Sequence, residues 1–157
     1  MADDQSAEVS WTPPRWLIPW ITRLQVAIYE LSRGRLLSHA SGMPHIVIHG
    51  VRRKSGTTFA VCLPYWRDDD GHRIVVASFA GAPRNPAWYH NLKDRRANPT
   101  ARVRDCERVF DVRVDVVDGD EREAIWKRLV ADRPFYARYQ ERTERRIPLL
   151  RLVEEGS

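Results

Sequence analysis

The spacing of hydrophobic and polar residues divides the chain into a helical beginning and a strand-rich remainder. Apolar residues recur every three or four positions from Ile18 to about residues 32–34, which predicts an amphipathic helix with Pro19 in its first turn. From Pro44 onward the period becomes two, which is typical of strands with one buried face. The strands are expected at residues 45–51, 57–66, 73–78, 100–104, 109–117 and 147–153.

The spaces between these strands contain further helices. A capping box of Asp120 and Glu123 predicts a helix that ends near Ala131, and a shorter helix is expected to begin near Pro134. Within residues 109–117 the apolar positions alternate with charged ones, so one face is expected to be buried; the apolar positions are Phe110, Val112, Val114 and Val116. Six strands with inserted helices predict an α+β, mainly β fold, in which the strands form a closed or partly closed antiparallel barrel. Residues 1–17 are interpreted as a flexible lead-in and residues 18–157 as a single domain.

Composition narrows the functional classes. The chain has 157 residues, of which 43% are hydrophobic, and its 26 basic residues are interspersed with 21 acidic ones. This surface suits anionic ligands, but no nucleic-acid recognition motif is present. Cys62 and Cys106 form neither a close pair nor a metal-binding spacing, and the first ten residues lack signal-peptide features. A cytoplasmic protein without disulfides is therefore expected.

The first helix leaves two interpretations open. Its apolar positions share one face and comprise Trp20, Ile21, Leu24, Ile28 and Leu31, whereas polar residues interrupt any run long enough to span a bilayer. The helix either packs on the domain or lies at a membrane surface, because tryptophans with flanking arginines suit a lipid interface.

Residues 77–92 form the stretch with the clearest features of a ligand-binding site. Asn85 is expected to be the N-cap of a helix whose first residue is Pro86. The helix would carry Trp88, Tyr89, His90 and Asn91 in its first turns, where free backbone N–H groups favour an anion. The same pattern also fits an ordinary strand-to-helix junction.

Two other segments offer chemistry. The turn at residues 52–56 contains three cations, a hydroxyl and a glycine, and it is either a phosphate site or a solvated hairpin turn. Phe135, Tyr136 and Tyr139 have helical spacing, which suits either a pocket wall with a phenol proton donor or core packing. His45 and His49 share one side of a strand without a third ligand, so no metal site is predicted.

Several motifs occur together in a characteristic order. They are Arg-Lys-Ser-Gly at residues 53–56, Ala-Ser at 77–78, Asn-Pro-Ala-Trp-Tyr-His-Asn-Leu at 85–92, Ala-Asn-Pro at 97–99, Tyr-x-x-Tyr-Gln at 136–140 and Arg-x-Ile-Pro at 145–148. This combination resembles the deazaflavin-dependent nitroreductase family. The resemblance implies a split β-barrel, FMN-binding-like fold of actinobacterial type that binds coenzyme F-420. FMN is the alternative flavin.

The resemblance also assigns roles to particular residues. It implies that Arg53, Lys54 and Ser55 hold the phosphodiester and glutamate tail of the coenzyme. The residues that would line the rest of the coenzyme are Phe59, Ala60, Val61, Cys62, Leu63, Pro64, Val76, Ala77, Ser78, Phe79, Ala87, Trp88, Tyr89, His90, Asn91 and Tyr136. The candidates for protonating the reduced substrate are Tyr136, which is ranked first, Tyr139 and Ser78.

The expected function is hydride transfer from reduced coenzyme F-420 to a quinone, an activated alkene or a nitro-type substrate. The alternative is a non-catalytic carrier of a flavin, haem or lipid. The expected partners are a small-molecule substrate and, through the first helix, the inner face of the membrane; a monomer and a homodimer both remain open.

Three departures from the family pattern affect the coenzyme site. Family members usually have arginine at the position of Phe59, proline at that of Cys62 and lysine at that of Phe79. With two cations missing, the tail is expected to meet other basic residues, drawn from Arg52, Arg53, Lys54, Arg84 and Lys93.

Overall fold

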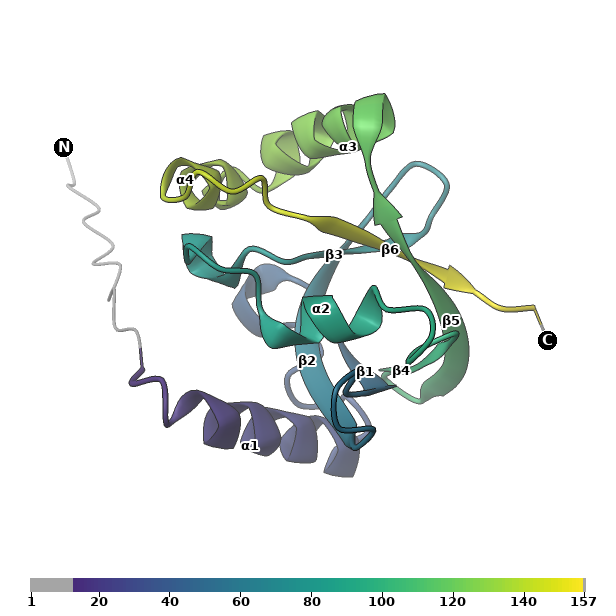
Figure 1. Ribbon diagram of the computed structural model, residues 1–157. Coiled ribbons are helices and arrows are strands. Elements are labelled where there is room, and N and C mark those ends of the chain that lie inside the picture. The colour runs from purple at the N-terminus through teal and green to yellow at the C-terminus, as the bar shows by residue number, and fades with distance from the viewer. Residues whose placement is uncertain (1–12, 157) are drawn as a thin grey trace, which may run out of the picture.

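The computed structural model describes residues 13–156, so most of the expected lead-in, residues 1–12, lies outside the described residues (Figure 1). The helices are α1 (Ile18–Leu31), α2 (Ala87–Leu92), α3 (Gly119–Asp132) and α4 (Phe135–Glu141). The strands are β1 (His45–Val51), β2 (Thr58–Arg67), β3 (Arg73–Val76), β4 (Ala101–Asp105), β5 (Arg108–Val117) and β6 (Leu149–Glu154). Two short 3-10 turns, η1 (Ala40–Gly42) and η2 (Phe79–Gly81), complete the elements. Among the described residues, no helix is both long enough and apolar enough to cross a membrane.

The six strands close into an antiparallel barrel with the order β1-β2-β3-β6-β5-β4. Ile48 is paired with Val61 on one side and with Val103 on the other, so β1 is hydrogen-bonded along both edges. β3 pairs with β6, which joins the middle of the chain to its end. The predicted fold class is confirmed. A closed barrel leaves no free sheet edge.

The barrel interior is filled by alternate side chains of all six strands. Tyr89 and Leu92 of α2 are also buried in this cluster, so α2 packs onto the barrel core. The predicted alternation of β5 holds for Val112 and Val114 but is wrong at its end, where Val116 is 45% exposed and Val117 is buried. Val117 lies on the face of β5 opposite to Val112 and Val114 and belongs to a second cluster, while both Val116 and Val117 remain paired with β6.

The second cluster lies between the barrel and the pair α3 and α4, which lie together at the top of Figure 1. Trp66 of β2 is packed there, and its indole N–H donates to Asp132 of α3 at 2.9 Å. The predicted capping box is wrong. Asp118 is the N-cap of α3, and its carboxylate accepts the N–H of Gly119 at 2.8 Å.

Helix α1 is attached to the barrel through polar groups. The Tyr29 side chain is fully buried; its hydroxyl donates to the carbonyl of His45 and accepts the N–H of Cys106, both at 2.9 Å. Glu30 pairs with His49 at 2.7 Å and with Arg104 at 2.5 Å. These contacts turn part of the predicted apolar face outward. Trp20, Leu24 and Leu31 are 63%, 61% and 87% exposed, so the expectation that this face packs on the domain is wrong for these residues.

Candidate functional site

The basic turn between β1 and β2 lies directly against α2. The backbone N–H of Arg53 donates to the side-chain oxygen of Asn91 at 3.1 Å. Gly56 has a φ of 71°, a conformation that glycine adopts without strain, and its N–H closes the turn onto the carbonyl of Arg52 at 2.8 Å. The turn and the helix that the sequence singles out separately therefore form one continuous surface.

A buried asparagine fixes this arrangement. Asn98 is 3% exposed, accepts the N–H of Val51 at 2.7 Å, and donates to the carbonyls of Val51 and Asn91 at 2.8 and 2.9 Å. A Cβ atom at Gly50 would lie 2.9 Å from the Asn98 side chain, so this glycine permits the close approach. The motif at residues 97–99 pointed to Asn98, but its spacing did not show which segments the side chain joins.

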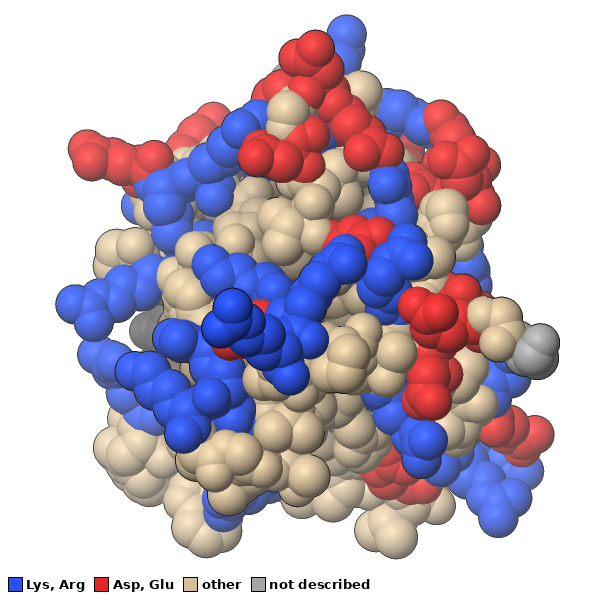
Figure 2. All heavy atoms as spheres, turned by 45° about the vertical axis from the view of Figure 1, so that its right-hand side comes forward, with Lys and Arg blue, Asp and Glu red and all other residues tan. Residues whose placement is uncertain are grey.

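The charges on this surface are unbalanced. Within residues 13–156, no carboxylate lies within ion-pair distance of Arg53, Lys54 or Lys93. Burial lowers the pKa of His90, and the positive charges of Lys93 and Arg53 lower it further. Figure 2 shows Lys and Arg side chains gathered on the left-hand side of one face, while Asp and Glu lie mainly along its top and right-hand margins. Such a surface attracts a polyanion.

The candidate residues of β2 divide between the two faces of the strand. Val61 is buried in the barrel core, and Phe59 and Leu63 pack against it. Ala60, Cys62 and Pro64 alternate with them and are half-buried on the other face. Burial raises the pKa of the Cys62 thiol to about 11, so the thiol is protonated at neutral pH and is no nucleophile.

Strand β3 ends earlier than predicted. It stops at Val76, although the buried Ala77 still donates its N–H to Pro148 at 3.0 Å. The chain then turns away into η2, where Phe79 has a φ of 44° and is 48% exposed. Ser78 is half-buried beside it. The predicted strand fails at Ser78 because the left-handed conformation of the next residues is incompatible with an extended ladder.

Helix α2 also begins one residue later than predicted. Pro86 is its N-cap, in an extended conformation, and Ala87 is its first residue. Asn85 does not cap the helix, because its side-chain oxygen accepts a hydrogen bond from Arg145 instead. Tyr89 is a core residue, whereas Trp88, His90 and Asn91 are half-buried. The six-residue helix therefore contributes side chains to the site and no separate anion site at its N-terminus.

The two tyrosines of α4 have different surroundings. Tyr136 is 4% exposed within the second cluster, and burial raises its pKa to about 12. Tyr139 is half-buried, and its ring centroid lies 6.1 Å from that of Tyr136 in an edge-to-face arrangement. Its carbonyl lies against η2: a Cβ atom at Gly81 would be 2.5 Å from this oxygen. Of the two phenols, only that of Tyr139 is partly accessible.

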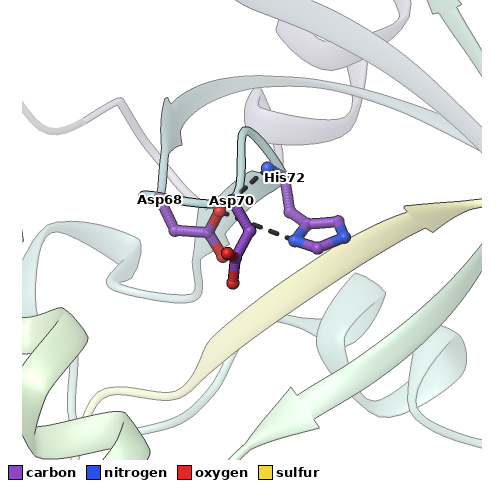
Figure 3. A group of neighbouring side chains, drawn as sticks. All are labelled: Asp68, Asp70 and His72. Atoms are coloured by element: carbon purple, nitrogen blue, oxygen red, sulfur yellow. Dashed lines mark hydrogen bonds and ion pairs between the residues drawn. The ribbon is translucent and has the colours of Figure 1, made fainter.

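A separate side-chain cluster occupies the turn between β2 and β3. Asp68, Asp70 and His72 bring possible metal-ligand atoms within 4.8 Å of one another (Figure 3). Asp68 is already engaged, since it accepts the backbone N–H of His72 at 2.8 Å and Nε of Arg151 at 3.2 Å. These contacts account for the burial of Asp68, and we assign it a structural role in the hairpin.

Comparison with known proteins identifies the family. The family model described as F420H(2)-dependent quinone reductase matches residues 20–154. The chain belongs to the F420H(2)-dependent quinone reductase family. The F420H(2)-dependent quinone reductase of Mycobacterium tuberculosis (strain ATCC 25618 / H37Rv) is 33% identical over 137 residues, which cover 85% of this chain and 89% of that protein.

Two solved structures agree with the fold. One, described as F420-H2 Dependent Reductase (FDR-A), is 37% identical with a TM-score of 0.59 and covers 69% of this chain and 93% of its own. Another, described as a domain-swapped dimer, is 33% identical with a TM-score of 0.62, and the match covers 86% of this chain and 98% of that one. The resemblance inferred from the motifs is thereby confirmed.

Proposed function

We propose that the protein transfers a hydride from reduced coenzyme F-420 to a quinone. The observation that carries this proposal is the junction of the basic turn with α2 in a member of this reductase family. When bound, the coenzyme supplies the hydride from its flat deazaflavin ring. The protein's contribution is to bind the anionic tail, position the ring and exclude water.

The tail fits the unbalanced charges of the turn. Arg53, Lys54 and Ser55 are exposed and offer two cations and a hydroxyl, and Lys93 extends the positive surface along α2. Arg52 is held in the turn, where its guanidinium donates to Thr57 at 3.2 Å and to the carbonyl of Thr58. A phosphodiester and a chain of carboxylates are the ligands that such donors bind well.

For the deazaflavin ring we propose the surface formed by β2, the segment from Val76 to Phe79, and the start of α2. The half-buried candidates are mainly apolar: Phe59, Leu63 and Trp88 pack against the barrel core, and Ala60, Cys62, Pro64 and Val76 lie on the outer face of the sheet. Ala87 is exposed at the start of the helix. The core residues Val61, Ala77 and Tyr89 support this surface from behind. Phe79 is exposed at the edge of this surface, where family members usually have lysine. Its aromatic ring suits a flat substrate.

A hydroxyl near the ring completes the reaction. Reduction of a quinone develops negative charge on oxygen, which a hydroxyl stabilises and protonates. We propose Ser78 and Tyr139 for this role, because both are half-buried beside η2. Tyr136 supports Tyr139 from the core, and its phenol becomes a donor only if α4 moves away from the second cluster.

We also propose that α1 contacts the inner surface of the cell membrane, where quinones dissolve. Trp20, Leu24 and Leu31 of α1 are 63%, 61% and 87% exposed, and Trp16, just before the helix, is 71% exposed. Arg15 and Arg23 are exposed beside them and suit anionic headgroups. The description of one neighbouring structure as a domain-swapped dimer supports a homodimer as the assembly.

A fluorescence titration tests coenzyme binding. Oxidised coenzyme F-420 added to the protein is expected to show saturable quenching, with weaker binding for the Arg53→Met and Lys54→Met double variant. The Arg102→Met variant is the matched control, because Arg102 is an exposed arginine paired with Asp111 on β5. Saturable binding of FMN or haem without binding of coenzyme F-420 would contradict the proposal.

A further inference from the structure

Arg145 lies outside every segment assigned a role so far, yet its guanidinium is directed at the loop formed by residues 77–85. Nε donates to the carbonyl of Ala82 at 2.7 Å and Nη2 to that of Ser78 at 2.6 Å. Nη1 donates to the carbonyl of Ala77 at 3.1 Å and to the side-chain oxygen of Asn85 at 2.5 Å. These acceptors lie at the beginning and at the end of the loop, so one side chain bridges its two ends.

All four acceptors are neutral. Within the part of the chain that the structure describes, no carboxylate forms an ion pair with Arg145, although its neighbour Arg146 pairs with Asp118 and Glu123. Burial lowers the pKa of Arg145, but a guanidinium remains charged at any physiological pH. A charged donor with only carbonyl and amide acceptors is suited to orienting a backbone segment, because bonds to a charged group are stronger than neutral ones.

The loop needs such a restraint. Phe79 and Ala80 have φ values of 44° and 51°, a region that side chains other than glycine rarely adopt. Gly81 follows with a φ of 78°, and a Cβ atom there would lie 2.5 Å from the carbonyl of Tyr139. Strained conformations of this kind persist only where their surroundings hold them. The loop is held by Arg145 on one side and by α4 on the other.

Arg145 is itself fixed to α4 by Gln140. The Gln140 side chain donates to the carbonyl of Arg145 at 2.7 Å and accepts the N–H of Ile147 at 3.0 Å. It also donates to the carbonyl of Thr143 at 3.3 Å. Hydrogen bonds therefore run from α4 through Gln140 to Arg145, and from Arg145 to the loop.

We infer that Arg145 is a positioning residue of the coenzyme site, which holds residues 77–85 in the shape that receives the deazaflavin ring and couples this loop to α4. The inference rests on the proposed function for the identity of the ligand. The effect on the loop itself is a property of the free protein. Gln140 is the second member of this positioning pair.

Hydrogen–deuterium exchange of the free protein tests the effect on the loop. In Arg145→Met, the amides of Gly81 and Ala82, which donate to Ser78 and Phe79, are expected to exchange at least roughly tenfold faster, as loss of one charge-assisted hydrogen bond implies. Arg145→Lys should restore part of the protection. Arg146→Met is the matched control and should leave both amides unchanged. If Arg145→Met fails to fold, Gln140→Leu is the second variant, and it should also speed amide exchange at Gly81 and Ala82 without affecting the barrel strands.

Coenzyme kinetics provide the second readout. Arg145→Met is expected to raise the Kd and KM for coenzyme F-420 by at least roughly tenfold while kcat changes much less, because Arg145 bonds the backbone carbonyl of Ser78 and not the hydroxyl proposed to act in the reaction. Unchanged exchange at Gly81 and Ala82, or equally faster exchange across all barrel strands, would overturn the inference. If the wild-type protein does not bind the coenzyme, the proposed function fails, and the exchange result still decides whether Arg145 holds the loop.

Discussion

Asn98 and Val51 exchange two hydrogen bonds: the Asn98 side chain accepts the N–H of Val51 at 2.7 Å and donates to its carbonyl at 2.8 Å. Val51 is the last residue of β1 and is paired with Thr58 of β2, whereas the pairing of β1 with β4 ends at His49, so the Asn98 side chain takes the place of the missing partner on the β4 side. The same amide binds the carbonyl of Asn91. The pair therefore connects the barrel, the turn and α2.

Replacing Asn98 should destabilise the protein. Asn98→Ala removes three hydrogen bonds from a side chain that is 3% exposed, and leaves partly buried backbone groups of Val51 and Asn91 without these partners. We expect the free energy of unfolding in urea to fall by about 2–4 kcal/mol. Thr100→Ala, an exposed substitution two residues away, should change it by less than about 0.5 kcal/mol. A loss no larger than that of the control would contradict the role of Asn98.

The ionisation of His90 should report the charge of the tail site. Burial, then Lys93 and Arg53, lower the pKa of His90 from its ordinary value of 6.5. The unfolded chain therefore binds the proton at a higher pH than the folded one, so the contribution of His90 to stability falls as pH drops through 6.5.

An NMR titration of the His90 ring measures this effect. Lys93→Met should raise the pKa of His90, and bound coenzyme should raise it too, because a polyanion favours the imidazolium form. Arg102→Met removes an arginine that is paired with Asp111, so it should leave the pKa of His90 unchanged. If the pKa of His90 changed neither in Lys93→Met nor on coenzyme binding, the coenzyme tail would not bind next to His90.

The three hydroxyl candidates should differ in their effect on turnover. Ser78 and Tyr139 are half-buried beside η2, whereas Tyr136 is 4% exposed. Loss of the proton donor should lower kcat by on the order of a hundredfold or more, so Ser78→Ala or Tyr139→Phe is expected to show this loss and Tyr136→Phe a much smaller one. If Tyr136→Phe had the largest effect, α4 would have to open during turnover.

Membrane contact should depend on the exposed residues of α1. Trp20→Ser with Leu24→Ser is expected to abolish sedimentation of the protein with vesicles of anionic phospholipid, because both side chains are more than half exposed and Arg23 lies between them. Val109→Ser with Val116→Ser removes comparable exposed apolar side chains from β5 and should leave sedimentation unchanged. Equal binding of both double variants would exclude α1 as the contact surface.

The fold followed closely from periodicity, whereas the details of the site did not. Alternation placed β1 and β2 to within one residue, because a strand with a buried face must repeat every second residue. Local rules failed where distant side chains intervene. Asn85 has the chemistry of an N-cap, but Arg145, 60 residues away, takes its oxygen. Trp20 and Leu24 follow the helical period of a packing face, yet Tyr29 and Glu30 orient α1 through polar contacts that no spacing reveals.

The site residues brought together by the fold come from segments whose proximity depends on barrel closure. Arg53 and Asn91 are 38 residues apart and meet because Asn98 joins β1 to α2. The motifs identified both partners, since each is a polar residue in a turn or a short helix. The motifs also ranked Tyr136 above Tyr139, and only the structure shows that Tyr136 is enclosed in the second cluster, where it is 4% exposed.

Turnover with a quinone distinguishes a reductase from a protein that only carries the coenzyme. Reduced coenzyme F-420, menadione and the purified protein are mixed without oxygen, and the absorbance of the oxidised coenzyme is followed. We expect enzyme-dependent oxidation of the coenzyme that requires menadione and saturates with both substrates. In the Arg53→Met and Lys54→Met double variant the KM for the coenzyme should be higher. Saturable binding of the coenzyme without menadione-dependent oxidation would contradict the proposed function and identify the protein as a coenzyme carrier.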